Sequence, residues 1–84
     1  MIYYLYIIES QKDKTLYTGI AKDVQKRLNE HNSGKGAKYT KGRGPFVLLL
    51  QITCENKSSA LKLEIKIKKL NKKQKHNFIL ENLK

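Results

Sequence analysis

Residues 2–20 read IYYLYIIESQKDKTLYTGI, and this stretch decides the fold. Residues 2–8 are nearly all aromatic or β-branched, which is typical of a strand buried on both faces. The polar residues 9–15 indicate a turn, and residues 16–20 a second short strand. Because the segment between the strands is too short for a parallel crossover, the two strands are expected to form an antiparallel hairpin.

A helix is expected over residues 23–32. Asp23 is suited to the N-cap position, and Gly34 is suited to stop the helix at its other end. Val24 and Leu28 lie four residues apart and therefore share a face of this helix.

A long loop and a third strand follow. Residues 33–45 contain four glycines and one proline, and loops of this length in compact domains are usually functional or disordered. Residues 46–53 are then a continuous apolar run, which predicts a strand too apolar to lie at a solvated edge.

Residues 60–70 fit two patterns. Apolar and charged residues alternate along most of the segment, as in a strand. A helix at about 100° per residue also fits, with the apolar side chains on one arc and most lysines opposite. A strand would expose Glu64 with the lysines, whereas a helix turns it inward, where Lys68 could pair with it. The length and the candidate caps Ser58 and Ser59 favour the helix.

The chain is expected to end in a helix over residues 72–83, with Phe78, Ile79 and Leu83 facing inward. No internal repeat or linker is visible. At 84 residues the whole chain, 1–84, is short enough to be one domain.

The composition narrows the function classes. A hydrophobic content of 39% and a mean hydropathy of -0.62 argue against a disordered polymer and a membrane protein. The single Cys54 excludes an internal disulfide and a cysteine-based zinc site, which favours a reducing compartment. The N-terminal apolar run is too short for a signal peptide, so a soluble, cytoplasmic protein is expected.

Positive charge is the strongest functional signal. The 18 Lys and Arg against 7 Asp and Glu give a net charge of +11, beyond the roughly 2–8 units that solubility needs. A polyanionic partner is therefore expected. The glycine-rich loop would let backbone N–H groups approach phosphate, although lysines on the helices alone could simply form a solvated face. The candidate nucleic-acid-binding residues are Lys35, Lys38, Lys41, Arg43, Lys72 and Lys73.

Two tyrosines could meet on the hairpin. If Tyr6 pairs with Tyr17 across the strands, both phenols share one sheet face. This register needs a turn centred between Gln11 and Lys12, and a slip of one residue would separate the rings. Gly19, after Tyr17, leaves space beside a phenol.

Three charged or titratable residues add to this pair. Arg27 and His31 stand four apart on the predicted helix and share a face, although each alone reads as a surface residue. An inward Glu64 is either an ion-pair partner for Lys68 or a metal ligand, because hard divalent cations prefer carboxylate oxygen.

These motifs occur in a specific order along nearly the whole chain. They are Tyr4-Leu5-Tyr6, Leu16-Tyr17-Thr18-Gly19-Ile20, Lys26-Arg27-Leu28, His31, residues 33–38 (SGKGAK) and Leu63-Glu64. The ordered set resembles the GIY-YIG nuclease family, and more narrowly its small single-domain bacterial branch. The resemblance implies an α+β fold in which a three-stranded antiparallel sheet is flanked by helices, in the order β-β-α-β-α-α.

The resemblance also implies roles. It makes Tyr6 and Tyr17 the motif tyrosines, Gly19 the motif glycine, Arg27 the catalytic cation and Glu64 the metal-binding acid, and His31 matches a histidine of some members. Two positions depart from the family pattern: Tyr4 stands where the first motif has its leading glycine, and Asn71 is only a loose counterpart of a late amide.

The expected function is a metal-dependent endonuclease that acts on DNA, including branched or damaged DNA, in repair or recombination. One Mg²⁺ or Mn²⁺ on Glu64 would stabilise the leaving oxygen, and Arg27 would hold a phosphate oxygen. Tyr17, Tyr6 or His31 would take the proton of the attacking water. The alternatives are a nucleic-acid-binding module with a degenerate site and a nuclease recruited by a protein partner; a monomer is favoured.

Overall fold

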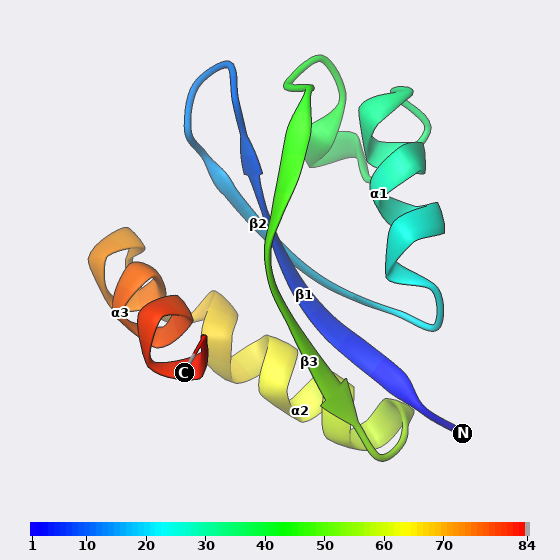
Figure 1. Cartoon of the computed structure of the whole chain (residues 1–84), viewed down its shortest axis with the longest axis vertical. Coiled ribbons are helices and arrows are strands. Elements are labelled where there is room, and N and C mark those ends of the chain that lie inside the picture. Colours follow the sequence, from blue (N-terminus) through cyan, green and yellow to red (C-terminus); the bar gives the residue numbers. More distant parts are fainter. Residues whose placement is uncertain (84) are drawn as a thin grey trace.

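Three antiparallel strands form a sheet in the order β2-β1-β3, with three helices packed around it (Figure 1). The computed structural model describes residues 1–83. The elements are β1 (Tyr3–Ser10), β2 (Leu16–Ala21), α1 (Val24–Asn32), a short 3₁₀ helix η1 (Lys38–Thr40), β3 (Phe46–Cys54), α2 (Lys57–Lys68) and α3 (Lys72–Asn82). The predicted α+β class and the order β-β-α-β-α-α are confirmed.

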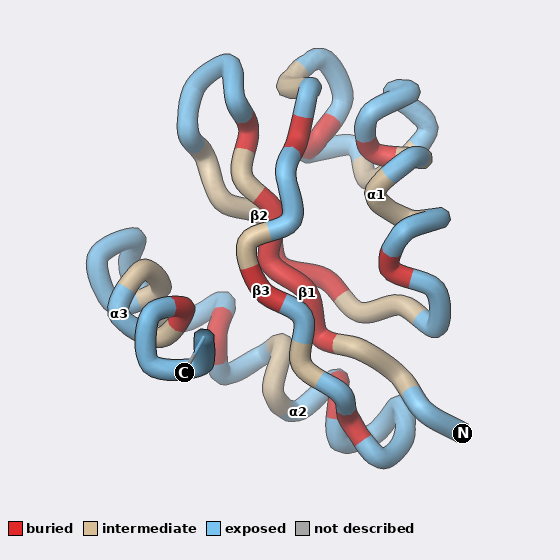
Figure 2. Tube along the Cα trace, viewed as in Figure 1, coloured by how far each residue is buried: buried red, intermediate tan, exposed pale blue. Residues whose placement is uncertain are grey.

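The central strand β1 separates two apolar cores (Figure 2). Its side chains alternate, so Leu5 and Ile7 pack with residues of α2 and α3, while Tyr6 and Ile8 pack with residues of α1. All four side chains are buried. Strand β1 is therefore buried on both faces, as predicted, and it presents Tyr6 on the α1 side.

The prediction that the third strand is not a solvated edge is wrong. β3 pairs only with β1 and forms one edge of the sheet, where Val47 is 40% exposed and Leu48 is 38% exposed. A shift in the pairing register between Ile7 and Ile8 leaves an extra residue on β3. In a three-stranded sheet only one strand has neighbours on both sides, and that strand is β1.

The hairpin register also differs from the prediction. Tyr6 pairs with Gly19, and Tyr17 pairs with Ile8. The turn is thus centred one residue later than expected, between Lys12 and Asp13, and the pairing shifts by two residues. Because side chains alternate with a period of two, Tyr6 and Tyr17 still lie on the same face.

Side-chain caps fix where the helices begin. Asp23 Oδ1 accepts from the Lys26 N–H at 3.0 Å, as predicted for α1. The cap of α2 is Asn56, whose side chain accepts from the Ser59 N–H at 2.9 Å, and not Ser58 or Ser59 themselves. Asparagine is also a preferred N-cap, and at position 56 it satisfies a free N–H group of a helix that begins at Lys57, earlier than expected.

The C-terminal helix matches its prediction in part. Asn71 caps α3 in a capping box with Gln74. Ile79 is buried and Phe78 packs against the same core, but Leu83 is 61% exposed, so its predicted inward position is wrong. Within residues 1–83, the helices are all too short or too polar to cross a bilayer.

Candidate active site

A chain of buried hydrogen bonds lies between the sheet and α1. The Tyr6 hydroxyl, from β1, is 2.8 Å from His31 Nε2, on α1. His31 Nδ1 is 2.7 Å from the Thr40 hydroxyl, on η1. Thr40 in turn donates to the Ala37 carbonyl at 2.8 Å. Tyr6, His31 and Thr40 are each no more than 1% exposed, so three separate elements are joined around one imidazole.

Two glycines make room for the rings of Tyr6 and His31 in this series of hydrogen bonds. A Cβ on Gly19 would lie 2.5 Å from Tyr6 Oη and 2.7 Å from Tyr6 Cζ. A Cβ on Gly36 would lie 2.8 Å from His31 Cγ and 2.9 Å from His31 Cα. Only residues without a side chain allow the two rings to sit where they do.

Burial controls the protonation of both rings. It raises the pKa of Tyr6 to about 12, and the neighbouring Tyr17 adds to the rise while Arg27 opposes it. Burial, with a smaller contribution from Arg27, lowers the pKa of His31 below its ordinary value. At neutral pH the site therefore holds a neutral phenol and a neutral imidazole.

Tyr17 lies at the mouth of the site. Its ring centroid is 5.0 Å from that of His31 and 6.4 Å from that of Tyr6. On its other side it stacks on Tyr39, with centroids 6.0 Å apart and planes at 24°. Tyr39 is 50% exposed, so the aromatic series runs from the buried imidazole to the solvent.

Arg27 faces the same site from α1. Its Nη1 is 3.0 Å from Glu30 Oε1 in an ion pair whose side chains are 34% and 38% exposed. The pKa of Arg27 is raised, first by the hydrogen bond to Glu30 and then by Tyr6. Arg27 also lines a hollow of about 350 Å³ with Lys22 and Lys26, among others. It therefore lies between the buried phenol and an open hollow whose lining also includes Asp23 and Glu30.

Glu64 lies on α2, as the helical interpretation of residues 60–70 predicted. Its side chain is 16% exposed, and its Oε2 is 3.2 Å from Lys68 Nζ. Lys68 Nζ is also 6.0 Å from the Tyr17 ring centroid, and Glu64 contributes to the raised pKa of Tyr6. The carboxylate is thus only partly exposed, acts on the charge of Tyr6, and is paired with Lys68, the lysine expected from the sequence.

The donors around Glu64 limit what kind of metal it can hold. Residues 1–83 contain no cluster of three or more His, Cys, Asp or Glu side chains placed for metal binding. Mg²⁺, however, commonly binds one or two carboxylates and completes its shell with water and substrate phosphate. Glu64 fits an ion of this kind, provided that Lys68 moves away.

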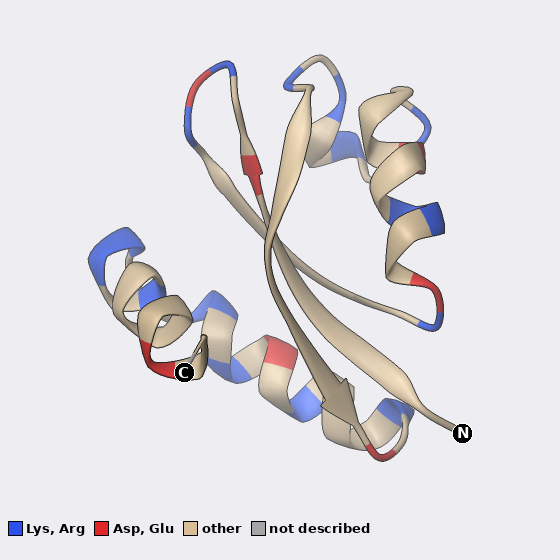
Figure 3. Ribbon diagram, in the orientation of Figure 1, with Lys and Arg blue, Asp and Glu red and all other residues tan. Residues whose placement is uncertain are grey.

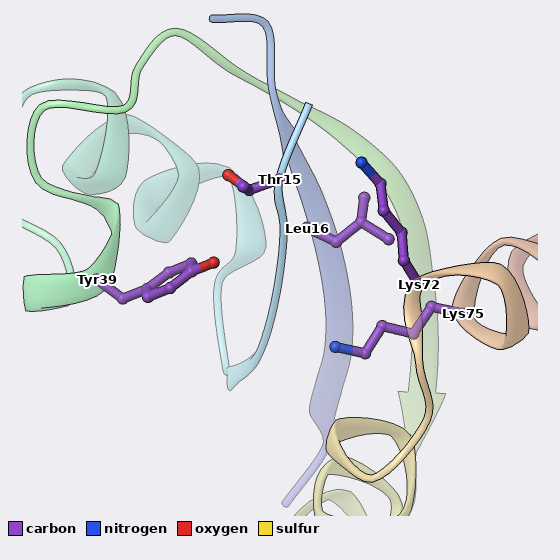
Figure 4. A pocket seen from close by; sticks show the side chains of 5 residues that line it. All are labelled: Thr15, Leu16, Tyr39, Lys72 and Lys75. Atoms are coloured by element: carbon purple, nitrogen blue, oxygen red, sulfur yellow. The ribbon is translucent and has the colours of Figure 1, made fainter. Parts of the chain in front are cut away.

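A groove runs along the β2 edge beside the tyrosines. One part, of about 440 Å³, is lined by Tyr17, Tyr39, Lys68 and Lys75, together with Leu16 and Thr18. The adjoining part, of about 200 Å³, has Tyr39 on one side of β2 and Lys72 and Lys75 on the other (Figure 4). Aromatic and cationic side chains thus line the same hollow.

The predicted nucleic-acid-binding residues lie in two regions. Lys and Arg cover the hairpin turn, the loop after α1, and both α2 and α3, with few acidic residues between them (Figure 3). Arg43 is committed to other contacts: its Nη1 is 2.7 Å from Asp13 Oδ2, and its guanidinium lies 4.8 Å from the Tyr39 centroid. Lys35, Lys38, Lys41, Lys72 and Lys73 are exposed.

Three residues near the site were not assigned to it from the sequence, although Gly36 belongs to the motif of residues 33–38. Thr40 and Gly36 contact His31, and Lys75 lines the groove. Their signal in the sequence is weak, because a threonine and a glycine in a loop carry no periodicity. Asn71, the loose counterpart of the late amide, is used as the α3 cap.

Comparison with known proteins gives a consistent picture. The GIY-YIG catalytic domain family matches residues 2–77. A UPF0213 protein of Cupriavidus necator is 51% identical over 90% of this chain and 82% of its own length. A UPF0213 protein of Staphylococcus saprophyticus is 48% identical over 94% and 95%.

Two solution NMR structures are similar to this fold. The UPF0213 protein BH0048 of Bacillus halodurans has a TM-score of 0.61 at 42% identity, covering 94% of this chain and 83% of its own. The protein EF2693 of E. faecalis has a TM-score of 0.65 at 33% identity, covering 100% and 90%.

Proposed function

Because the chain belongs to the GIY-YIG family, we propose that it is a metal-dependent endonuclease that hydrolyses DNA phosphodiester bonds. The catalytic domain of this family implies a nuclease-type function. The DNA substrate, the divalent cation and a role in repair or recombination are the further content of the proposal. The observation that carries it is the buried Tyr6–His31 pair, which lies beside Tyr17 at the mouth of a basic groove.

The buried pair is arranged to remove a proton from water. Tyr6, with a pKa of about 12, is a weak acid and is not a phenolate at neutral pH. It can still accept a proton from the attacking water while its own proton passes to His31 Nε2, 2.8 Å away. Tyr17, at the mouth, orients that water.

Arg27 and Glu64 act on the phosphate. Arg27 donates to a non-bridging oxygen, for which its planar guanidinium is suited. Its exposed pair with Glu30 is weak and can open. A divalent cation held by Glu64 would supply Lewis-acid stabilisation of the charge that develops on the oxygens.

The test is cleavage of supercoiled plasmid and of linear, nicked, flapped and four-way DNA across a Mg²⁺ and Mn²⁺ titration. We expect Glu64→Gln and Arg27→Ala to lower the cleavage rate by about a hundredfold or more while DNA binding is largely kept. Glu81→Gln on α3 makes the same change away from the site and should cut like the wild type. Equal cutting by wild type and Glu64→Gln would reject the proposal.

A second candidate function is a nucleic-acid-binding module that does not cut. The ion pair of Glu64 with Lys68 favours it, because it neutralises the carboxylate that would bind the cation. This candidate predicts strong, salt-dependent binding and no cleavage with any divalent ion. A nuclease that needs a protein partner would instead begin to cut when repair or recombination proteins are added.

A further inference from the structure

The direction of each hydrogen bond around His31 follows from Thr40. The Ala37 carbonyl can only accept, so the Thr40 hydroxyl uses its single hydrogen to donate to it, at 2.8 Å. Toward His31 Nδ1, 2.7 Å away, the same hydroxyl oxygen can therefore only accept. The ring proton must then lie on Nδ1.

This placement decides the contact with Tyr6. A neutral imidazole with its proton on Nδ1 has a bare Nε2, which can only accept. The Tyr6 hydroxyl, 2.8 Å from Nε2, must therefore donate. The phenol proton therefore points to His31. The phenol oxygen can still accept a hydrogen bond, and Arg27 is the neighbouring cation that favours its charged form.

We propose that Thr40 is a positioning residue whose hydroxyl holds His31 in the tautomer that can take the proton of Tyr6. The part of this inference that concerns cleavage rests on the proposed function. In that step a proton of the attacking water moves to Tyr6 Oη, and the Tyr6 proton moves to His31 Nε2. The new O–P bond forms from the resulting hydroxide as the bond from phosphorus to the leaving sugar oxygen breaks, and the leaving oxygen takes a proton from solvent water. The other tautomer, with a proton already on Nε2, could not accept it.

Burial makes the choice of tautomer depend on this hydroxyl. His31 is 1% exposed, so water does not readily replace Thr40 as the partner of Nδ1. In Thr40→Val the Nδ1–H would be left unsatisfied in the interior, at a cost that moving the proton to Nε2 avoids. The valine is close to threonine in shape, so the packing changes little.

The direct test is a ¹⁵N–¹H correlation spectrum of the His31 ring at neutral pH. We expect a protonated Nδ1 and a bare Nε2 in the wild type and in Thr40→Ser, and a shift toward the opposite tautomer in Thr40→Val. Thr53→Val, on the exposed part of β3, is the matched control and should keep the wild-type pattern. A wild type with its proton on Nε2 overturns the inference, whatever the variants do.

Cleavage gives the second measurement. Thr40→Val should lower the cleavage rate by about tenfold or more, the scale on which proton-transfer groups act, and Thr40→Ser should restore it. A Thr40→Val protein that folds, has the opposite tautomer and cuts at the wild-type rate overturns the catalytic part. A wild type with the expected tautomer that cuts no DNA supports the placement by Thr40 and rejects only the proposed function.

Discussion

Gly19 lies opposite Tyr6 in the hairpin, and the phenol occupies the space where a side chain would be. A methyl group at this position would be 2.5 Å from Tyr6 Oη, and the buried ring has no room to retreat. We expect Gly19→Ala to lower the free energy of unfolding by roughly 1–3 kcal/mol, the usual cost of overpacking. It should also separate Tyr6 from His31. Urea unfolding measures the first effect and the His31 ring signals the second.

A double-mutant cycle provides the control for this prediction. Tyr6→Phe removes the atom nearest to the added methyl group, so Gly19→Ala should cost less in that background than in the wild type. If the two substitutions lower the free energy of unfolding additively, the glycine is needed for the backbone conformation of the hairpin and not for space beside the phenol.

His31 makes stability depend on pH. In the folded protein, burial lowers the pKa of His31 below its ordinary value of 6.5. At a pH between these two pKa values, the imidazole is therefore protonated in the unfolded chain and neutral in the folded protein. Stability present above pH 6.5 should therefore be lost as the pH falls through the lowered pKa. Urea unfolding between pH 7.5 and 5 measures the slope, which His31→Gln should reduce. His76→Gln is the control, and an equal reduction in both variants would contradict the prediction.

At the scale of residues, the sequence predicts which side chains of the candidate site come together better than it predicts the contacts that they make. Tyr6, Tyr17 and His31 could be found because motif spacing and helical periodicity bring them together. Thr40 could not, because it reaches His31 only through the path of a loop that has no regular pattern. The expected pairing of Tyr6 with Tyr17 was wrong by two residues, since a polar turn without a strong type signal does not fix the register.

At the scale of elements, periodicity and capping residues predict where the helices lie. The exposure of the strands depends instead on which elements pack and pair with them. The helical interpretation of residues 60–70 is confirmed, and on this helix Glu64 is turned inward. The exposure of β3 could not be predicted, because an apolar run shows that a strand packs on something but not whether a neighbour pairs with each of its edges.

Helix α2 also carries a prediction about the cation. Lys68 pairs with Glu64 at 3.2 Å, and a divalent cation on the same carboxylate would repel the ammonium group. Lys68→Met should therefore tighten Mn²⁺ binding to the free protein by roughly two- to fivefold, the scale of a partly exposed ion pair. Paramagnetic broadening of NMR signals near Glu64 measures this without any cleavage. Lys66→Met, on the same helix, should leave the affinity unchanged; the same affinity in Lys68→Met and wild type would rule out competition.

At the scale of the whole molecule, the net charge is +11, and Lys and Arg are spread over the helices and loops on both sides of the sheet (Figure 3). Such a field attracts any polyanion without selecting a path for it. The groove supplies a path, because Lys72 and Lys75 face Tyr39 across β2. Total charge could be read from the sequence, but the side on which these lysines meet an aromatic ring depends on how α3 packs.

The salt dependence of DNA binding separates the contribution of the overall charge from that of the lysines that line the groove. Each lysine that neutralises a phosphate adds about 0.9 to the slope of log affinity against log salt concentration. Lys72→Ala/Lys75→Ala should therefore reduce the magnitude of that slope by about two, as measured by fluorescence anisotropy at several NaCl concentrations. Lys57→Ala/Lys62→Ala removes the same charge from α2, at positions that do not line the groove, and should change the slope much less. If both pairs reduce it equally, the DNA is held by diffuse charge and does not follow the groove.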